Sequence, residues 1–291
     1  MAQARRTDDP TRRTLLAARA GGEVVGAAEL SLLGPDNPHL AELEVAVAPA
    51  HQRAGVGRSL WRAAREAAVA DGRDTVVGEV YASPDSGGAA LAFATAMGAV
   101  SVHQEEHLAL ELDRAATPPD PDAARDGYTV VAWGGRCPDE HLAAYARLRT
   151  RMEHDVPQGE LDRRPIEVTE ERVRAREGRL SPSYDSLVAA ARHVVSGELV
   201  GYTQLLVPHG ETEVVQDDTL VEPEHRGHGL GARLKRVNLA RLRVEHPGAT
   251  AVHTWTAPDN APMLRTNLAL GFVVVERMHE VQARLGEPPR R

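Results

Sequence analysis

The sequence predicts an α/β chain of two tandem domains with the same fold, and three observations lead to this prediction. Strand-like and helix-like segments alternate along the 291 residues. The two halves repeat the same order of segments with an offset of 226 − 52 = 174 residues, taken between Arg226 and Gln52. A repeat this long indicates duplicated domains instead of a solenoid. The length itself also fits about two domains.

The strongest part of the repeat is a glycine motif. In each half a strand-like run ends in V-x-P, continues as [QR]-x-x-G-x-G and leads directly into a helix-like stretch. A glycine turn that opens a helix leaves several backbone N–H groups unpaired and converging, which suits a phosphate or pyrophosphate. The two copies are Val47, Pro49, Gln52, Gly55, Gly57 and Val221, Pro223, Arg226, Gly229, Gly231.

The repeat extends beyond this loop. At the same offset Glu44 falls on Asp218, and the pair Pro84-Asp85 falls on Pro258-Asp259. With a shift of one residue, the run 22–26 falls on the run 197–201. Matching turns, loops and helix ends in one order are not expected by chance, so the duplication covers whole domains.

The elements of the first half follow from its periodicity and its turn residues. Two strands joined by Gly21-Gly22 form a hairpin, and residues 40–48 alternate as a half-buried strand does. A helix follows the glycine motif, and a helix of small residues ends at Gly98. The expected strands are 14–20, 23–33, 40–48, 75–81 and 100–112, and the expected helices are 56–70 and 86–97.

The second half contains the same series after an additional opening. Residues 115–126 have the proline-rich composition of a linker, so the domains are expected at 1–114 and 127–291. About 48 residues precede the first loop and about 95 precede the second, which predicts a first domain reduced at its N-terminus or a chain that begins downstream of the natural start. The expected strands are 128–133, 187–195, 198–207, 212–221, 250–256 and 272–285, and the helices are 138–151, 169–178, 230–245 and 261–270.

Composition excludes several classes of protein. A formal charge of −8 argues against a nucleic-acid surface. Cys137 is the single cysteine, so no intramolecular disulfide or CxxC metal site exists. No apolar run approaches the roughly 18 residues of a membrane span, and no signal-peptide pattern opens the chain. The thirteen histidines lack metal-ligand spacing. A cytoplasmic protein without a metal is expected, as a monomer or homodimer.

The order strand, V-x-P, [QR]-x-x-G-x-G, helix, strand, Asn, helix, G-F resembles the GNAT superfamily of acyl-CoA-dependent N-acyltransferases. The second half has the fuller version, from Val221 through Asn260 to Gly271-Phe272. The resemblance implies two GNAT-like domains, each a mixed, mostly antiparallel twisted sheet flanked by helices. It also implies acetyl-CoA as co-substrate and a primary amine as acceptor. The cofactor-binding residues it implies are Leu220, Val221, Arg226, Gly227, His228, Gly229, Leu230, Gly231, Ala232 and Asn260.

Other interpretations of the glycine loops are weaker. The P-loop pattern G-x-x-x-x-G-K-[ST] is absent, and Gly227-x-Gly229-x-Gly231 is not the G-x-G-x-x-G of a dinucleotide site. A glycine turn with a purely structural role is a stronger alternative for the first loop than for the second, because a duplicated domain can keep its turn and lose its ligand.

The candidate general bases are two aspartates on the strand before the second loop. Direct acetylation of an ammonium group first requires loss of a proton, which a carboxylate or a water held by one can accept. Adjacent strand residues point to opposite faces, so at most one of Asp217 and Asp218 is expected to face the cleft. Asp218 is preferred because it matches Glu44 in the repeat. The alternative is a solvated charge at a strand end.

Two asparagines complete the expected site. Asn260 matches a family residue that contacts the cofactor arm, although an asparagine there can equally cap a helix. Family members often have a tyrosine, the general acid near the CoA sulfur, where this chain has Asn267. Asn267 can donate a hydrogen bond to sulfur but is not an acid. Tyr184, Tyr202 and His279 are unranked substitutes for the acid.

The acceptor is expected to be a small-molecule or peptide amine. The segment 152–171 carries Glu153, Asp155, Glu160, Asp162 and Glu167, which form either an acidic wall for such an amine or an ordinary solvated face. The sequence thus predicts an N-acetyltransferase whose second domain performs the chemistry. A non-catalytic acyl-CoA sensor is the alternative, and a ligand-free pseudo-dimeric scaffold is the weakest interpretation.

Overall fold

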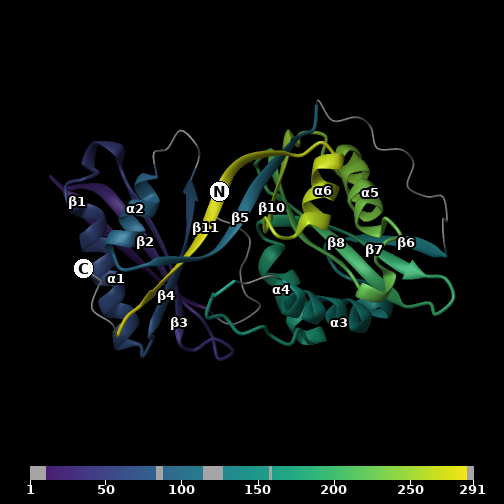
Figure 1. The fold of residues 1–291 in the computed structure, drawn as a ribbon, viewed down its shortest axis with the longest axis horizontal. Coiled ribbons are helices and arrows are strands. Elements are labelled where there is room, and N and C mark those ends of the chain that lie inside the picture. The colour runs from purple at the N-terminus through teal and green to yellow at the C-terminus, as the bar shows by residue number, and fades with distance from the viewer. Residues whose placement is uncertain (1–10, 83–87, 114–126, 157–158, 287–291) are drawn as a thin grey trace. The chain divides into compact units, whose positions relative to one another are not determined.

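The computed structural model describes residues 11–82, 88–113, 127–156 and 159–286 (Figure 1). The expected linker at 115–126 and the positions Pro84, Asp85 and Ser86 lie outside these ranges. The described chain forms two compact units. The N-unit contains residues 9–105, 157–164 and 276–291, and the C-unit contains residues 106–156 and 165–275, in each case within the described ranges.

The N-unit is a five-stranded sheet in the order β1-β2-β3-β4-β11. Its pairs are antiparallel except for β3 with β4, which is parallel. Leu30, Ala41 and Val76 on the strands pack against Ala64 and Ala68 of the first helix. Its elements are β1 (Arg12–Ala20), β2 (Glu23–Leu32), β3 (Leu40–Val47), α1 (Val56–Ala70), β4 (Thr75–Ala82) and α2 (Ala89–Ala96).

The C-unit is a six-stranded sheet in the order β5-β10-β9-β8-β7-β6. Within its described residues β9 and β10 pair in parallel, and the other neighbouring strands pair antiparallel. Its helices are α3 (Asp139–Asp155), α4 (Glu170–Leu180), α5 (Leu230–Glu245) and α6 (Ala261–Ala269). Its strands are β6 (Tyr128–Gly134), β7 (Tyr184–His193), β8 (Leu199–Pro208), β9 (Glu213–Val221) and β10 (Ala251–Thr256).

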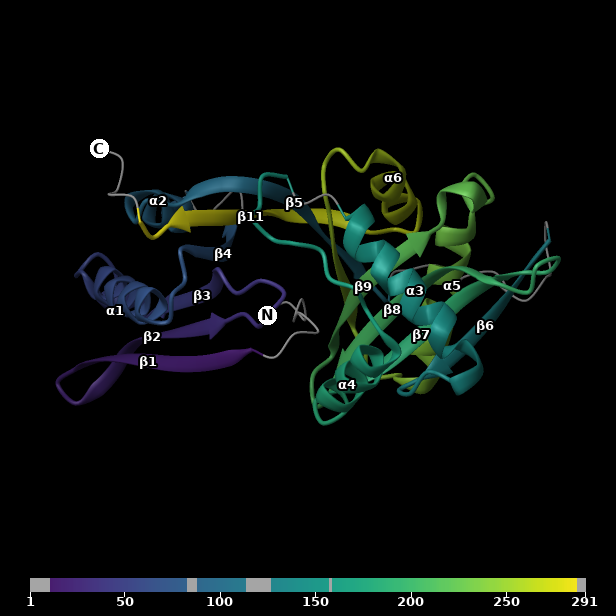
Figure 2. The same ribbon diagram turned by 90° about the horizontal axis from the view of Figure 1, so that it is seen from below.

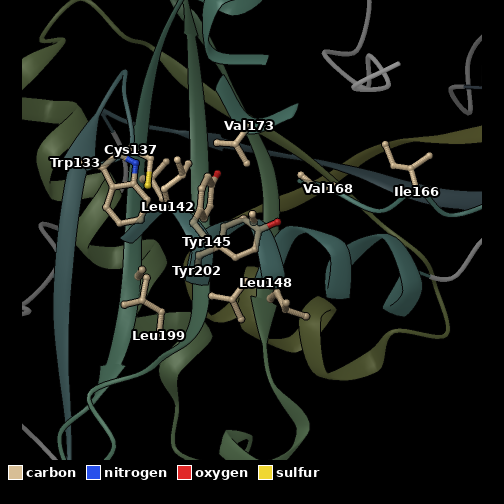
Figure 3. Packing of buried hydrophobic residues seen from close by; sticks show 14 residues of the cluster. Trp133, Cys137, Leu142, Tyr145, Leu148, Ile166, Val168, Val173, Leu199 and Tyr202 are labelled. Carbon is tan, nitrogen blue, oxygen red and sulfur yellow. The ribbon is translucent and has the colours of Figure 1, made fainter. Parts of the chain in front are cut away.

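The helices of the C-unit cover both faces of its sheet (Figure 2). Val188 and Ala190 of β7 pack into a cluster with α3 and α4, which also contains Tyr145 and Tyr202 (Figure 3). The alternating residues Ala189 and Ala191 pack into a separate cluster with α5. Since successive strand residues point to opposite faces, α3 and α4 lie on one face and α5 lies on the other.

Two long strands are divided between the units. β5 (Val100–Glu111) enters the C-unit at Glu106 and pairs there with β10 over residues 106–111. β11 (Val273–Arg284) passes into the N-unit at Glu276 and pairs there with β4. Each sheet is therefore completed by a strand from the other half of the sequence.

The predicted fold class is confirmed. Every expected strand and helix is present, with shifts of a few residues such as β7 starting at Tyr184 instead of 187. Helix α2 begins at Ala89, and its expected first residues lie outside the described ranges. The described part of the N-unit has no counterpart of β6, α3 and α4, in agreement with the reduced first domain. Within the described residues, no helix is long and apolar enough to cross a lipid bilayer.

Candidate active site

The glycine loop of the C-unit connects β9 to α5 through a short 3-10 turn, η2 (Pro223–His225). Gly227 and Gly229 have φ angles of 85° and 69°, the left-handed conformation that glycine adopts without strain. Arg226 Nε donates to the carbonyl of Val221 at 2.9 Å. The predicted cofactor-binding residue Arg226 therefore braces the loop against the end of β9 in this structure.

The loop directs unpaired N–H groups away from the helix. Gly229 is the N-cap of α5, and the N–H of Arg233 is the first to bond back to its carbonyl, at 3.1 Å. The N–H groups of residues 230–232 precede that bond, so they have no partner within the helix. Together with the helix dipole they form an anion-binding end.

The glycine loop of the N-unit has the same backbone but different surroundings. Gln52 Nε2 donates to Val47 at 3.2 Å, as Arg226 does to Val221, which explains the [QR] position of the motif. A Cβ placed on Gly57 would lie only 3.2 Å from the ring of Phe93. A Cβ on the corresponding Gly231 would meet nothing closer than 3.9 Å. An aromatic ring therefore crowds Gly57 at the start of α1, while Gly231 at the start of α5 has only an ordinary contact with Thr219.

The two parallel strands of the C-unit separate before they reach the loop. β9 and β10 pair only at Glu213–Val215 with Ala251–His253. Both strands continue beyond these residues, β9 to Val221 and β10 to Thr256. Their facing edges therefore carry backbone groups that are not bonded to each other. Such an opening between strands can pair with an extended ligand arm.

A β-bulge brings both candidate aspartates to one face. Opposite β8 the register jumps between Thr203 and Leu205, whose partners are Thr219 and Gln216, so β9 has one additional residue. Arg176 of α4 bonds Asp217 at 2.6 Å, and Arg149 of α3 lies 3.7 Å from Asp218. The expectation that at most one aspartate faces this side is wrong, because the bulge interrupts the alternation.

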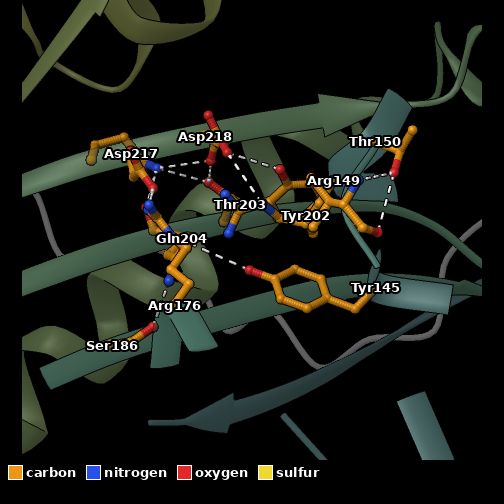
Figure 4. A network of polar contacts seen from close by, with 12 residues as sticks. Tyr145, Arg149, Thr150, Arg176, Ser186, Tyr202, Thr203, Gln204, Asp217 and Asp218 are labelled. Carbon is orange, nitrogen blue, oxygen red and sulfur yellow. Dashed lines mark hydrogen bonds and ion pairs between the residues drawn. The ribbon is translucent and has the colours of Figure 1, made fainter. Parts of the chain in front are cut away.

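Asp218 is the more accessible carboxylate of the two. Its side chain is 25% exposed, against 11% for Asp217. Tyr202 donates its hydroxyl to Asp218 Oδ2 at 3.0 Å (Figure 4). Burial, and then the negative charge of Asp218, hold the pKa of Tyr202 well above its usual value. Tyr202 therefore stays protonated and serves as a fixed donor to Asp218.

A cavity of about 340 Å³ lies against α3, α4 and the strands β6 to β8. Arg149 lines this cavity and also lies 3.7 Å from Asp218, so this arginine connects the cavity with the carboxylate. Burial raises the pKa of Tyr145, which lines the cavity too, to about 12. The side chains that give the cavity its chemical character are Trp133, Tyr145, Tyr184, Arg149, Arg176 and Glu177.

The two asparagines have different surroundings. Asn260 caps α6 by accepting a bond from the N–H of Met263 at 3.3 Å, which matches the capping interpretation. Asn267 is fully buried, and its Oδ1 accepts a bond from Lys235 Nζ at 2.7 Å. Its Nδ2 donates to Thr256 Oγ1 at 3.0 Å. Sequence reasoning did not assign Lys235 a role, although a lone lysine among so many arginines was a signal.

Lys235 is an unusual charge within the core. Burial alone lowers the pKa of Lys235 from 10.5 to about 7, and its Nζ lies 5.8 Å from the centre of the Phe272 ring. The unfolded chain therefore binds one more proton than the folded chain between pH 7 and 10.5, so stability increases as pH rises through this window.

Between pH 7 and pH 9 we expect the free energy of unfolding of the natural chain to increase by roughly 2 kcal/mol relative to Lys235→Met, since one pKa unit corresponds to 1.36 kcal/mol. Urea unfolding of both proteins at the two pH values measures this difference. No other lysine can contribute, because the chain has one. If the free energy of unfolding depends on pH in the same way in both proteins, the pKa of Lys235 is not lowered in the folded chain.

The three candidate substitutes for the general acid lie in different surroundings. Tyr184 lines the cavity and Tyr202 bonds Asp218, while His279 is in the N-unit, where Ser101 Oγ lies 3.1 Å from its Nδ1. Asp155 pairs with Arg151 and Arg226, at 2.9 and 3.1 Å. This acidic residue therefore neutralises arginines in this structure. No group of three potential metal ligands occurs within the described ranges.

Comparison with known proteins agrees with this geometry. The Acetyltransferase (GNAT) family matches residues 2–99 and 160–272. A mycothiol acetyltransferase of Cellulomonas flavigena is 30% identical over 280 residues, covering 92% of this chain and 72% of the relative. One from Thermomonospora curvata is 32% identical over 260 residues, covering 86% and 76%.

A solved tandem GNAT protein from the clavulanic acid biosynthesis pathway superimposes with a TM-score of 0.79. It is 33% identical, and the match covers 96% of this chain and 84% of that one. A GCN5-related N-acetyltransferase from Sphaerobacter thermophilus shares the fold, with a TM-score of 0.64 and 19% identity. The match covers 92% of this chain and 79% of that one. The matches in both halves and the identity over most of the length show that this chain belongs to the GNAT family of acetyltransferases.

Proposed function

We propose that the protein transfers an acetyl group from acetyl-CoA to a primary amine, and that the C-unit performs this reaction. One observation carries the proposal: of the two described units, the C-unit combines a glycine loop that no aromatic ring crowds with a bulged strand that presents Asp218. The corresponding strand of the N-unit, β3, pairs with β2 without a register shift. The names of the relatives, mycothiol acetyltransferases, support the reaction class. We further propose a cytoplasmic monomer or homodimer.

The chain's residues would act in the following order. The N–H groups of residues 227–232 bind the diphosphate of acetyl-CoA, and the unpaired edges of β9 and β10 bind its extended arm. Asp218, directly or through a water, takes a proton from the acceptor ammonium. The neutral nitrogen attacks the thioester carbonyl, which backbone N–H groups at the separated strands polarise. The C–S bond breaks, the CoA thiolate leaves, and the nitrogen, positively charged after its attack, loses its second proton to solvent to give the neutral amide.

The cavity beside Arg149 is the proposed acceptor site. It lies on the α3 and α4 face, where Asp218 contacts Arg149 and Tyr202. Aromatic rings and guanidinium groups dominate its lining, so it suits an amine that carries an apolar or planar body together with an acceptor or anionic group. A fully cationic acceptor such as a polyamine fits this lining less well.

Release of free CoA thiol from acetyl-CoA across a panel of small amines, amino acids and peptides tests both proposals. We expect turnover with at least one amine, and a several-fold higher KM for that amine in Gly178→Leu, because Gly178 lines the cavity and a Cβ there meets open space. Gly248→Leu, also open but outside the cavity, is the matched control.

A specific observation favours the second candidate function, a non-catalytic acyl-CoA sensor. Asn267 stands where the family often has its acidic tyrosine, and it is buried against Lys235. Tight binding of acetyl-CoA without thiol release on any amine would support the sensor and contradict the enzyme.

A further inference from the structure

Lys235, Asn267 and Thr256 form a directional chain of hydrogen bonds in the C-unit. The nitrogen of Lys235 donates to Asn267, so the atom of Asn267 that faces it is the oxygen. The bond from Nζ to Oδ1 is 2.7 Å long. The amide nitrogen of Asn267 consequently faces Thr256, and it donates to the hydroxyl oxygen at 3.0 Å. The chain begins on α5, crosses α6 and ends on β10.

The chain ends in the hydroxyl hydrogen of Thr256, for which no described residue serves as acceptor. Thr256 is 3% exposed, and its oxygen already accepts from Asn267. Its own O–H must therefore point elsewhere, and among the residues that the structure describes no acceptor bonds it. Thr256 is the last residue of β10, beyond the segment that pairs with β9. A buried donor without a partner is costly, so a bound group that accepts from this hydroxyl would be stabilised by it.

The N-unit provides an internal comparison at the same register. Trp61 corresponds to Lys235, since α1 and α5 begin 174 residues apart, at Val56 and Leu230. Ala94 corresponds to Asn267, because their carbonyls accept equivalent bonds from Ala99 and Phe272. Val80 corresponds to Thr256, because each lies six residues after an equivalent strand start, at Asp74 and Thr250, whose carbonyls accept from Leu285 and Leu112. Trp61, Ala94 and Val80 pack in one apolar cluster of the N-unit. All three polar positions of the C-unit are thus apolar in the duplicated domain. Packing within this fold does not require the polar chain, so its presence points to a function confined to the C-unit.

We propose that Thr256 donates its hydroxyl hydrogen to the sulfur of the acyl-CoA as it leaves as a thiolate, with Asn267 and Lys235 as positioning residues. This inference rests on the proposed function. When the acceptor nitrogen bonds to the acyl carbon, the C–S electron pair passes to sulfur, which becomes negative. Thr256 keeps its proton and stabilises that charge through a hydrogen bond, and the thiolate takes a proton from solvent after release.

The positioning roles follow from the chain itself. Without the Lys235 donor, the Asn267 amide can turn its oxygen toward Thr256, and the hydroxyl would then donate to Asn267 instead of to the ligand. Thr256 is the candidate catalytic residue because it ends β10, beyond the segment of that strand that pairs with β9.

Titration of bound CoA tests the proposal without turnover. The thiolate is followed by its ultraviolet absorbance, as the difference between complexes with CoA and with desulfo-CoA, which cancels protein tyrosine signals. In the natural protein we expect the pKa of the bound thiol to fall at least one unit below the roughly 8.5 of a free thiol. Thr256→Val, which has the same shape without the hydroxyl, and Lys235→Met should both return it to about that value.

Thr256→Ser is the matched control, since it keeps the hydroxyl and should keep the lowered pKa. Desulfo-CoA should have the same affinity for the natural protein and for Thr256→Val. Above the lowered pKa of the thiol, the affinity of CoA for Thr256→Val should be about tenfold lower than its affinity for the natural protein. Two outcomes would contradict this inference: the natural protein binds both ligands but leaves the thiol pKa unshifted, or the thiol pKa stays lowered in Thr256→Val. In either case the proposed function survives. If neither ligand binds, the proposed function fails and the inference fails with it.

Discussion

Gly229→Glu is expected to weaken acetyl-CoA binding at least about 100-fold, which corresponds to about 2.7 kcal/mol. Gly229 caps α5 at a φ of 69°, and a Cβ there meets open space, so the new side chain has room but extends from the loop that would hold the diphosphate. Two like charges about 4 Å apart repel by about 4 kcal/mol at an effective dielectric constant of 20. Isothermal calorimetry with acetyl-CoA measures the loss.

The duplicated loop offers a closely matched control. Gly55 caps α1 at a φ of 87°, and a Cβ there also meets nothing within 4 Å. Gly55→Glu therefore imposes the same backbone strain and the same charge on a loop of the same shape. We expect its affinity to stay within about threefold of the natural protein. Loss of binding in Gly55→Glu alone would move the cofactor site to the N-unit.

The loops were predictable from sequence because glycine at the helix start favours their geometry. Gly55 and Gly229 have positive φ angles that glycine adopts readily, while at the position of Gly227 the first loop has Arg53 with a φ of 62°. The [QR] position was also identifiable, and the structure adds its reason: Gln52 and Arg226 each bond the carbonyl five residues earlier. At these turns the residues of the motif themselves determine the local backbone structure.

The environment of Asp217 and Asp218 was not predictable in the same way. Strict alternation along β9 would separate the two side chains, and a bulge leaves no mark in the residue types that form it. The bulge is visible only in the pairing of β9 with β8, where Thr203 and Leu205 oppose Thr219 and Gln216. Pairing register is a property of two strands, so the sequence of one strand does not determine it.

The division of β5 and β11 between the units has a similar cause. Their lengths and apolar patterns predict strands correctly, but a strand pattern does not name its partner. β11 pairs with β4, and β5 pairs with β10, so the partners are almost 200 and about 145 residues away in the chain. The role of Lys235 was hidden for the same reason, because Asn267 and Thr256 meet it only through packing of α5, α6 and β10.

Asp218→Asn is expected to lower kcat by about 10²- to 10⁴-fold, the usual contribution of a general base. The amide keeps the shape of the side chain and can still accept from Tyr202, which donates to Asp218 at 3.0 Å. The variant should therefore fold normally and bind acetyl-CoA as before, because its loss is confined to proton removal from the acceptor. Steady-state kinetics with an accepted amine, together with calorimetry, separate these effects.

Asp217→Asn is the control at the neighbouring residue, and it should lower stability instead of kcat. Asp217 and Arg176 are 11% and 8% exposed and bond at 2.6 Å, so the amide would leave a buried guanidinium with a weaker, neutral acceptor. We expect kcat to change little and the free energy of unfolding to fall by roughly 1–3 kcal/mol. The bulge makes this contrast informative, since both carboxylates lie on one face and differ in their partners. A large loss of kcat in Asp217→Asn with normal activity in Asp218→Asn would reassign the base.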